Sequence, residues 1–298
     1  MRSSMVLTYF ILVCIFWGGS YFAINISLTG FSPFLAAAIR VAIAALLSLA
    51  YMKTRGRHLQ IGHLAPVIIN GAIGVGIPWA LLFWGEQHVQ PALASIIIAT
   101  SPLFTLLFIG PIAGRDSEPI TRGKKLGIVL GMVGIAVIFM PSISRPEGAL
   151  GIIAIIGTAI CYGISVAWLK KLAPHVDNAS MLFLECIGAL SVLVPISLAH
   201  GFSAYFLTGE PLLKPLAAIF YLGICSTFVA FILFYKLVRA MGGTGAATTT
   251  YLVPIVSIII DGVVSKKWIG FHEAIGAIII FIALGFVHKT SRLDTEVI

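Results

Sequence analysis

The sequence alternates between long apolar runs and short polar stretches, and this alternation predicts membrane-spanning helices. A helix needs about 20 apolar residues to cross about 30 Å of hydrocarbon, because each residue adds about 1.5 Å along the axis. Ten runs of that kind, bounded by charges, glycines or prolines, cover residues 5–28, 31–52, 65–84, 91–113, 124–141, 149–170, 178–199, 213–235, 246–264 and 270–288. The pattern predicts an all-α integral membrane protein with ten transmembrane helices.

Composition indicates the same class. Of the 298 residues, 59% are hydrophobic and 10% are charged, and the mean hydropathy is +1.06. A soluble domain is typically about 45–50% apolar and about 25% charged. The net charge of +8 does not indicate nucleic acid binding, because the basic residues form short clusters between the apolar runs rather than one basic face.

The four cysteines, Cys14, Cys161, Cys186 and Cys225, all lie inside apolar runs. They lack the short paired spacings of zinc or thiol-exchange sites, so we interpret them as small packing residues. We therefore expect no metal site and no cofactor.

The lysines and arginines predict the orientation of the helices, since cytoplasmic loops carry an excess of both. With the N-terminus inside, fourteen basic residues fall on the cytoplasmic side, four fall on the outer side, and Arg40 lies within a span. The outer four are Arg145, Lys214, Lys266 and Lys267. Both termini are therefore expected in the cytoplasm. The first run lacks the cleavage site of a signal peptide and is expected to remain as a helix.

The chain also contains a weak internal repeat. Trp17, Gly18 and Ser20 match Tyr162, Gly163 and Ser165 at an offset of 145 residues, and Pro102 matches Pro254 at an offset of 152. The two halves are residues 5–141 and 149–288, followed by a short cytoplasmic tail at 289–298. Five spans per half is an odd number, so the second half should enter the membrane from the opposite side. Such inverted repeats are typical of transporters, with the substrate site between the halves.

The order and doubling of these motifs resemble the drug/metabolite transporter superfamily and its tandem EamA domains. The runs that carry the resemblance include "FWGGSYFAI", "ASIIIATSPLFTLLF", "GAATTTYLVPIV" and "AIGAIIIFIALGFV". The resemblance implies an inverted five-plus-five arrangement, a central cavity lined by helices 1 to 4 and 6 to 9, and peripheral helices 5 and 10. It also implies export of amino acids or other small metabolites. Lys267 departs from the family pattern, because the first half has Glu118 at the matching position.

Polar residues follow one stripe of the expected helix at 246–264. Ala247, Thr250, Pro254, Ser257 and Asp261 are spaced three and four residues apart and share one helical face. This stripe fits the wall of a wet cavity, with Tyr251 beside it, although close helix packing would also use small polar residues.

Four of the charged residues in or near the spans are candidates for a functional role. Arg40 is near the middle of its helix, where we weigh a structural role against binding of a substrate carboxylate. Glu185 is its counterpart at the offset of 145 residues. Glu86 and Asp261 lie near the outer ends of their helices and are interfacial carboxylates, proton carriers or ligands for a substrate amine. Glu86, Glu185 and Asp261 are thus the candidate coupling residues.

Aromatic and polar side chains recur at helical spacing on the expected helices 1 and 6. Trp17, Tyr21 and Asn25 form one stripe, and Cys161, Ser165 and Trp168 form another, with Trp79 on helix 3 as a further candidate. Such walls suit flat, apolar or cationic groups, although packing or an interfacial belt is the more common role of any single aromatic. Gly123, Gly127 and Gly131 give two GxxxG spacings that indicate close packing, within the bundle or between protomers.

Enzyme motifs are absent from the sequence, including GxSxG, HExxH, a P-loop and GxGxxG. We therefore expect a non-enzymatic secondary transporter of the inner membrane that exports small metabolites by alternating access, with proton coupling as a hypothesis. The alternatives are a flippase for lipid or lipid-linked substrates, a membrane scaffold or an intramembrane enzyme. The expected partners are a small-molecule substrate and the lipid bilayer, and the protein is expected to be a monomer or homodimer.

Overall fold

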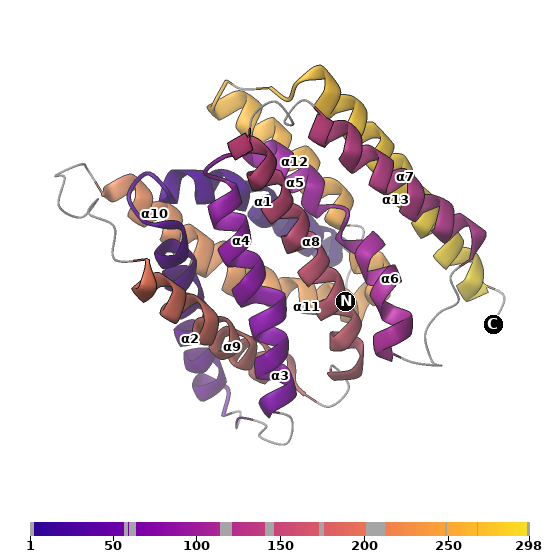
Figure 1. Cartoon of the computed structure of the whole chain (residues 1–298). Helices are drawn as coiled ribbons and strands as arrows, with labels where there is room; N and C mark the ends of the chain where they lie inside the picture. The colour runs from indigo at the N-terminus through magenta and orange to yellow at the C-terminus, as the bar shows by residue number, and fades with distance from the viewer. Residues whose placement is uncertain are drawn as a thin grey trace.

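A computed structural model describes residues 3–56, 59, 64–113, 121–140, 146–172, 176–200, 212–247, 249–266 and 268–296. These residues form helices and no strand (Figure 1). The first half contains α1 (Ser3–Ser27), α2 (Pro33–Thr54), α3 (Leu64–Gly71), η2 (Ala72–Gly76), α4 (Ile77–Gly85), α5 (Pro91–Ile98), α6 (Ser101–Ala113) and α7 (Arg122–Phe139). The second contains α8 (Pro146–Leu172), α9 (Asn178–Ala199), α10 (Leu213–Tyr221), η6 (Leu222–Val229), α11 (Ala230–Ala247), α12 (Thr249–Val264) and α13 (Phe271–Glu296).

Seven helical segments of the described chain are long and apolar enough to cross a membrane by length and composition. They are Ser4–Ser27, Pro33–Thr54, Leu64–Gly85, Pro91–Ile112, Glu147–Leu169, Asn178–Ala199 and Leu213–Leu237. The other three expected spans coincide with α7, α12 and α13, of which α12 and the apolar part of α13 are shorter apolar helices. A multi-span, all-helical membrane protein is thus confirmed, while the count of ten spans stays a prediction.

Two of the long segments contain a π-helical stretch in the middle. One is η2, between α3 and α4, and the other is η6, between α10 and α11. In the first, Pro78 has no N–H to donate to the carbonyl four residues before it, which favours a local change of helical hydrogen bonding. In the second, the hydroxyl of Thr227 donates to the carbonyl of Leu222 at 2.8 Å and so satisfies a backbone group inside the widened turn. Such π-helical stretches often mark functional positions.

Helices of one half pack mainly against helices of the other. α1 packs on α12, α6 on α8, and α2 on α9. The closest approach joins α3 and η2 to α9, where glycines replace side chains. A Cβ on Gly71 would lie 2.2 Å from the carbonyl oxygen of Glu185, and a Cβ on Gly188 would lie 1.9 Å from that of Ile68. Only glycine permits this contact between the backbones.

The last helices of the two halves, α7 and α13, lie side by side at one edge of the molecule (Figure 1). A Cβ on Gly127 would lie 2.8 Å from the carbonyl oxygen of Ala283, and a Cβ on Gly134 would lie 2.9 Å from that of Gly276. The glycine-rich face of α7 is therefore used for packing within the chain. Large apolar side chains such as Val129 (59% exposed) and Ile278 (58% exposed) point outward from the pair, as expected of a lipid-facing surface.

Candidate functional site

Arg40 lies in the middle of α2 and faces η6 and α4. Its side chain is 4% exposed. Its Nε donates a hydrogen bond to Oγ1 of Thr227 at 2.9 Å, and its Nη2 donates to Oγ of Ser226 at 3.4 Å. Its Cζ lies 3.7 Å from the ring centroid of Trp79. The guanidinium group is thus held between two hydroxyls of one half and an indole of the other.

Further hydrogen bonds connect these residues to α1 and α8. Nε1 of Trp79 donates to the hydroxyl of Tyr162 at 2.8 Å, and Nε1 of Trp17 donates to the carbonyl of Ser226 at 3.1 Å. The Trp17 ring also packs against Phe234, with the centroids 5.0 Å apart. We call the connected set the arginine network; its members are Trp17, Arg40, Trp79, Tyr162, Ser226 and Thr227.

The chemistry of the arginine network suits an anionic ligand group. A charged side chain at mid-membrane costs about 2.5–3.5 kcal/mol on insertion scales, so Arg40 needs stabilising partners. The hydroxyls and the indole stabilise the cation, the indole by about 2 kcal/mol when water is excluded, but they carry no negative charge. A carboxylate that reached Arg40 would therefore gain charge-assisted hydrogen bonds that these neutral partners do not provide.

Glu185, the counterpart of Arg40, has a different partner. Its side chain is 5% exposed and its Oε1 accepts a hydrogen bond from Nδ2 of Asn70 at 2.8 Å. Asn70 is the next-to-last residue of α3, immediately before the Gly71 contact with α9. Arg40 and Glu185 are therefore positioned by separate contacts with the opposite half, Arg40 by residues of η6 and Glu185 by the end of α3, just before η2.

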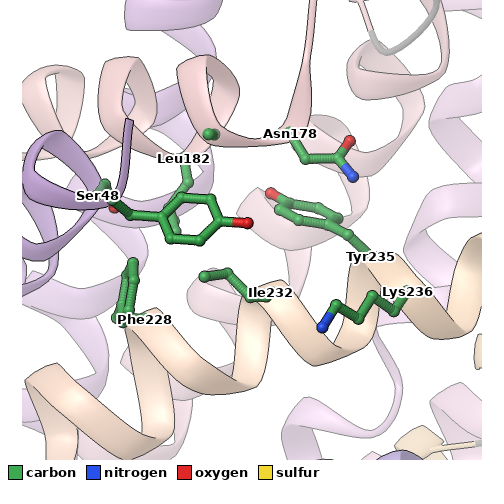
Figure 2. A pocket seen from close by; sticks show the side chains of 9 residues that line it. Ser48, Asn178, Leu182, Phe228, Ile232, Tyr235 and Lys236 are labelled. Atoms are coloured by element: carbon green, nitrogen blue, oxygen red, sulfur yellow. The ribbon is translucent and has the colours of Figure 1, made fainter. Parts of the chain in front are cut away.

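A pocket of about 90 Å³ opens between α2, α9 and the η6–α11 segment. Figure 2 shows side chains of three helices facing one another across it, among them Ser48, Asn178 and Ile232. The residues that line it are Ser48, Tyr51, Asn178, Ala179, Leu182, Phe228, Ile232, Tyr235 and Lys236. The pocket combines aromatic rings, uncharged polar groups and the ammonium group of Lys236.

The pocket and the two buried charges share helix faces. Ser48 and Tyr51 follow Arg40 by eight and eleven residues, which places all three on one side of α2 and Ser48 about 12 Å further along the axis. On α9, Leu182 and Glu185 follow Asn178 by four and seven residues on one face. The pocket therefore lies on the same walls as Arg40 and Glu185, toward the C-terminal end of α2.

Glu86 and Asp261 lie on the opposite side of the bundle from the pocket. Each is 1% exposed. Oδ2 of Asp261 accepts a hydrogen bond at 3.4 Å from the backbone N–H of Ala92, in the first turn of α5. Neither carboxylate oxygen of Glu86 has a hydrogen-bond partner among the described residues. Both groups are buried, which disfavours the interpretation of Asp261 as a simple interfacial carboxylate.

The remaining residues singled out by sequence are distributed over the bundle. Tyr21 (7% exposed) belongs to the central hydrophobic core. Ser165 (9% exposed) lies against Gly74 of η2. Ser257 (1% exposed) is buried on the same stripe of α12 as Asp261, and its Oγ has no partner among the described residues.

Four of them lie apart from the arginine network. Trp168 packs with a separate cluster that contains Val67, Leu172 and Leu184. The hydroxyl of Tyr251 donates to the carbonyl of Leu284 at 3.0 Å and so faces α13. Thr250 is half-buried near the start of α12, and Asn25 is exposed near the end of α1. The structure therefore gathers Trp17, Arg40 and Trp79 but not these four.

Sequence reasoning missed several members of the site. Tyr162 stands out in the sequence only as the repeat partner of Trp17, and Ser226 and Thr227 were not singled out. A Ser–Thr pair inside an apolar run was a usable signal, since it matches the polar stripe of the expected ninth helix. Asn70 and the pocket residues had no comparable signal. In the described part of the chain, no group of three or more His, Cys, Asp or Glu side chains could hold a metal ion.

Comparison with known proteins gives consistent relatives. The model of the EamA-like transporter family matches residues 4–140 and 149–288. An uncharacterized transporter of Archaeoglobus fulgidus is 27% identical over 91% of this chain and 94% of its own, and the uncharacterized inner membrane transporter YedA of Escherichia coli is 25% identical over 91% and 87%. A probable terminal-alkyne amino-acid exporter of Streptantibioticus cattleyicolor is 24% identical over 91% and 87%. One solved crystal structure shares the fold with a TM-score of 0.66 at 19% identity, over 96% of this chain and 97% of that one.

Proposed function

Because the chain belongs to the EamA-like transporter family, we propose that it is a secondary transporter that exports small metabolites such as amino acids across the inner membrane. The relatives are named as transporters, and one is named as a probable amino-acid exporter. These names fit a protein without enzymatic activity. Without an ATP site in the sequence, transport runs on an ion gradient or downhill.

The proposed architecture is ten spans arranged as an inverted five-plus-five repeat. The symmetry of the contacts between the two halves supports this arrangement. The first span packs on the ninth (α1 on α12), as the sixth packs on the fourth (α8 on α6). The two π-helical stretches also correspond, since η6 packs on α2 beside Arg40 and η2 packs on α9 beside Glu185. Transport by alternating access then consists of one half moving against the other around a site between them.

The observation that carries the proposed substrate class is the pair of buried, opposite charges on the two walls that continue into the pocket. An amino acid carries a carboxylate and an ammonium group, which Arg40 and Glu185 complement. Trp79 and Phe228 provide apolar surface for its side chain, since one contacts Arg40 and the other lines the pocket. The pocket is the entrance by which the substrate approaches Arg40.

The proposed transporter has its pocket on the cytoplasmic side, and the basic residues support this orientation. Lys53 at the end of α2 and Lys236 at the pocket belong to the predicted cytoplasmic clusters, and both termini are expected on that side. Glu86 and Asp261, near the predicted outer side, are buried. This arrangement corresponds to a conformation that is open to the cytoplasm and closed outside. The partners are the small-molecule substrate and the lipid bilayer, and the protein acts as a monomer or homodimer.

The test compares metabolites in cells and medium for strains that overproduce the wild type, Arg40→Ala or Arg122→Ala. Arg122 is an exposed arginine at the start of the peripheral α7, so it is the matched control. Loss of a buried charge partner costs about 2–5 kcal/mol, so Arg40→Ala should reduce export at least about 30-fold at equal protein level. The wild type and Arg122→Ala should enrich the same amino acid in the medium and deplete it from the cells.

Other outcomes contradict the proposal in distinct ways. Depletion of a compound from the medium would reverse the direction of transport. Unchanged metabolites together with altered lipid distribution between the membrane leaflets would favour the flippase. Export by Arg40→Ala at the wild-type rate would remove Arg40 from the substrate site.

A further inference from the structure

Glu86 combines deep burial with an absence of hydrogen bonds. It follows the last residue of the segment Leu64–Gly85, and its own backbone N–H is used by the end of α4, donating to the carbonyl of Leu82. Its side chain is 1% exposed, and neither carboxylate oxygen has a partner among the described residues. A charged carboxylate without hydrogen bonds in such a place is strongly disfavoured, whereas the neutral acid is tolerated.

Charged and titratable groups on four helices interact electrostatically with the Glu86 carboxyl. The titratable and charged groups that interact with it are Arg40 of α2, Asp261 of α12, Tyr21 of α1 and Tyr162 of α8. Burial raises the pKa of the Glu86 carboxyl well above its usual range, Arg40 lowers it and Asp261 raises it. Asp261 itself is held by the N–H of Ala92, at the positive end of the α5 helix dipole. Of the two carboxylates, Asp261 thus has a hydrogen-bond donor, whereas Glu86 has none among the described residues.

We propose that Glu86 is a proton-binding site whose protonation permits the outer side of the bundle to close. This inference rests on the proposed transport function and identifies a group through which the outside pH controls closure of the outer side. When the outer side opens, water reaches Glu86 and the carboxyl ionises more readily. When it closes, the carboxyl takes up a proton from the outside.

The sign of the pH dependence follows from linkage. The closed state binds more protons than the open state, so lower outside pH favours closure. Because one proton is involved, the ratio of open to closed protein changes at most about tenfold per pH unit, between the pKa values of the two states. Glu86 takes its proton from the outer solution and returns it there, so the outside pH controls closure although no proton is carried across the membrane.

The test measures outer-side opening without a substrate, so its result is independent of which metabolite is carried. The four native cysteines are removed from the full-length chain, and Ser257→Cys then introduces a single cysteine. This variant is treated from outside with a thiol reagent that does not cross the membrane. Ser257 is 1% exposed, so its labelling reports opening. Thr29→Cys, an exposed position after α1, corrects for the effect of pH on the reagent.

The corrected labelling should fall several-fold as the outside pH falls from about 8 to about 5. Glu86→Gln, which resembles the protonated acid, should label weakly at both pH values. Glu147→Gln, which replaces an exposed carboxylate at the start of α8, should behave as the wild type.

The midpoint of thermal unfolding of the purified wild type should fall as the pH rises from about 5 to about 8, because the buried acid resists ionisation in the folded state. The unfolding midpoint of Glu86→Gln should change less with pH.

Three results would overturn the proposal. The first is pH-independent labelling together with a thermal midpoint whose pH dependence is the same in wild type and Glu86→Gln. The second is a pH dependence of labelling that persists in Glu86→Gln. The third is closure driven by Na⁺ at constant pH, which would make the carboxylates a cation site. Export without pH-dependent opening would leave the transport function intact and remove only the role of Glu86 in closure.

Discussion

Arg40 and Glu185 occupy related positions in the two halves, yet their surroundings differ. Arg40 donates to two hydroxyls of η6 and lies against the ring of Trp79. Glu185 accepts from the amide of Asn70, beside a contact in which Gly71 meets the backbone of α9. The backbone arrangement is repeated, a helix against a π-helical region, but the side chains have diverged to opposite charge. In the proposed substrate site, these opposite charges would orient a zwitterion.

The tightness of the two contacts also differs, and this difference gives the largest expected effect. A Cβ on Gly71 would lie 2.2 Å from the backbone carbonyl oxygen of Glu185, whereas a Cβ on Gly223 would first meet the side chain of Ile43 at 2.7 Å. Gly71→Ala should therefore destabilise the protein by about 3 kcal/mol or more, and Gly223→Ala by about 1–3 kcal/mol. The measurement is thermal unfolding of the purified variants.

Gly285→Ala is the matched control for both glycine variants. Gly285 lies in α13, and a Cβ added to it would meet no atom within 4 Å. Because alanine favours a helix over glycine by about 1 kcal/mol, this variant should be as stable as the wild type or slightly more stable. Equal destabilisation by Gly71→Ala and Gly285→Ala would contradict the close backbone contact.

Substitution of Arg40 and of Glu185 tests the difference in charge between the two positions. Arg40→Lys keeps the charge but loses the planar group that bonds two hydroxyls and stacks on Trp79, so export should fall about tenfold. Glu185→Gln keeps an acceptor for Asn70 and loses the charge, so it should reduce export of amino acids more than export of analogues without an ammonium group. The readout is uptake into inside-out vesicles of an amino acid and its deaminated analogue. An equal loss for both analogues would exclude contact of Glu185 with the amine.

A smaller change addresses only the hydroxyl side of the arginine network. Thr227→Val has nearly the same shape but removes the acceptor for Nε of Arg40 and the donor to the carbonyl of Leu222. Loss of hydrogen bonds at a charged group costs about 1.5–3 kcal/mol, so the free energy of unfolding should fall by about that amount. Thr29→Val, at an exposed threonine, is the comparison. Unchanged stability of Thr227→Val would mean that Arg40 is held chiefly by Trp79.

The smallest effect is expected at Asn25. Its side chain is exposed near the end of α1, away from the arginine network. Asn25→Ala should therefore keep export within about twofold of the wild type, as surface substitutions usually change free energies by about 0.5 kcal/mol or less. A large loss of export in the same vesicle assay would return Asn25 to the substrate site.

The positions of the helices were largely predictable because hydropathy determines which segments enter a membrane. The run 178–199 coincides with α9, and the run 31–52 lies close to α2, whereas α11 and α13 extend beyond their expected ends. Arg40 was also predictable as a site residue, since a charge within an apolar run is costly. The break between α5 and α6, and the two π-helical stretches, depend on local backbone hydrogen bonds that hydropathy does not record.

The geometry of the site was less predictable, because helical spacing gives a face but not its neighbour. Trp17 and Asn25 share a predicted stripe, yet one reaches Ser226 and the other is exposed at the helix end. Tyr251 belongs to the polar region of α12 but bonds to α13. Offsets in the repeat paired Arg40 with Glu185, although each is held by a different hydrogen-bond partner. Which helices face each other is determined by packing between residues far apart in sequence.

The pairing of α7 with α13 has a consequence for how the protein is made. During translation, α7 enters the membrane well before α13, which contains the last apolar run of the chain. The glycines at 127 and 134 that later contact α13 then face lipid or the insertion machinery, without the backbone contacts that they have in the complete molecule. The pairing of α7 therefore waits for α13, and the first half lacks these backbone contacts when it leaves the ribosome.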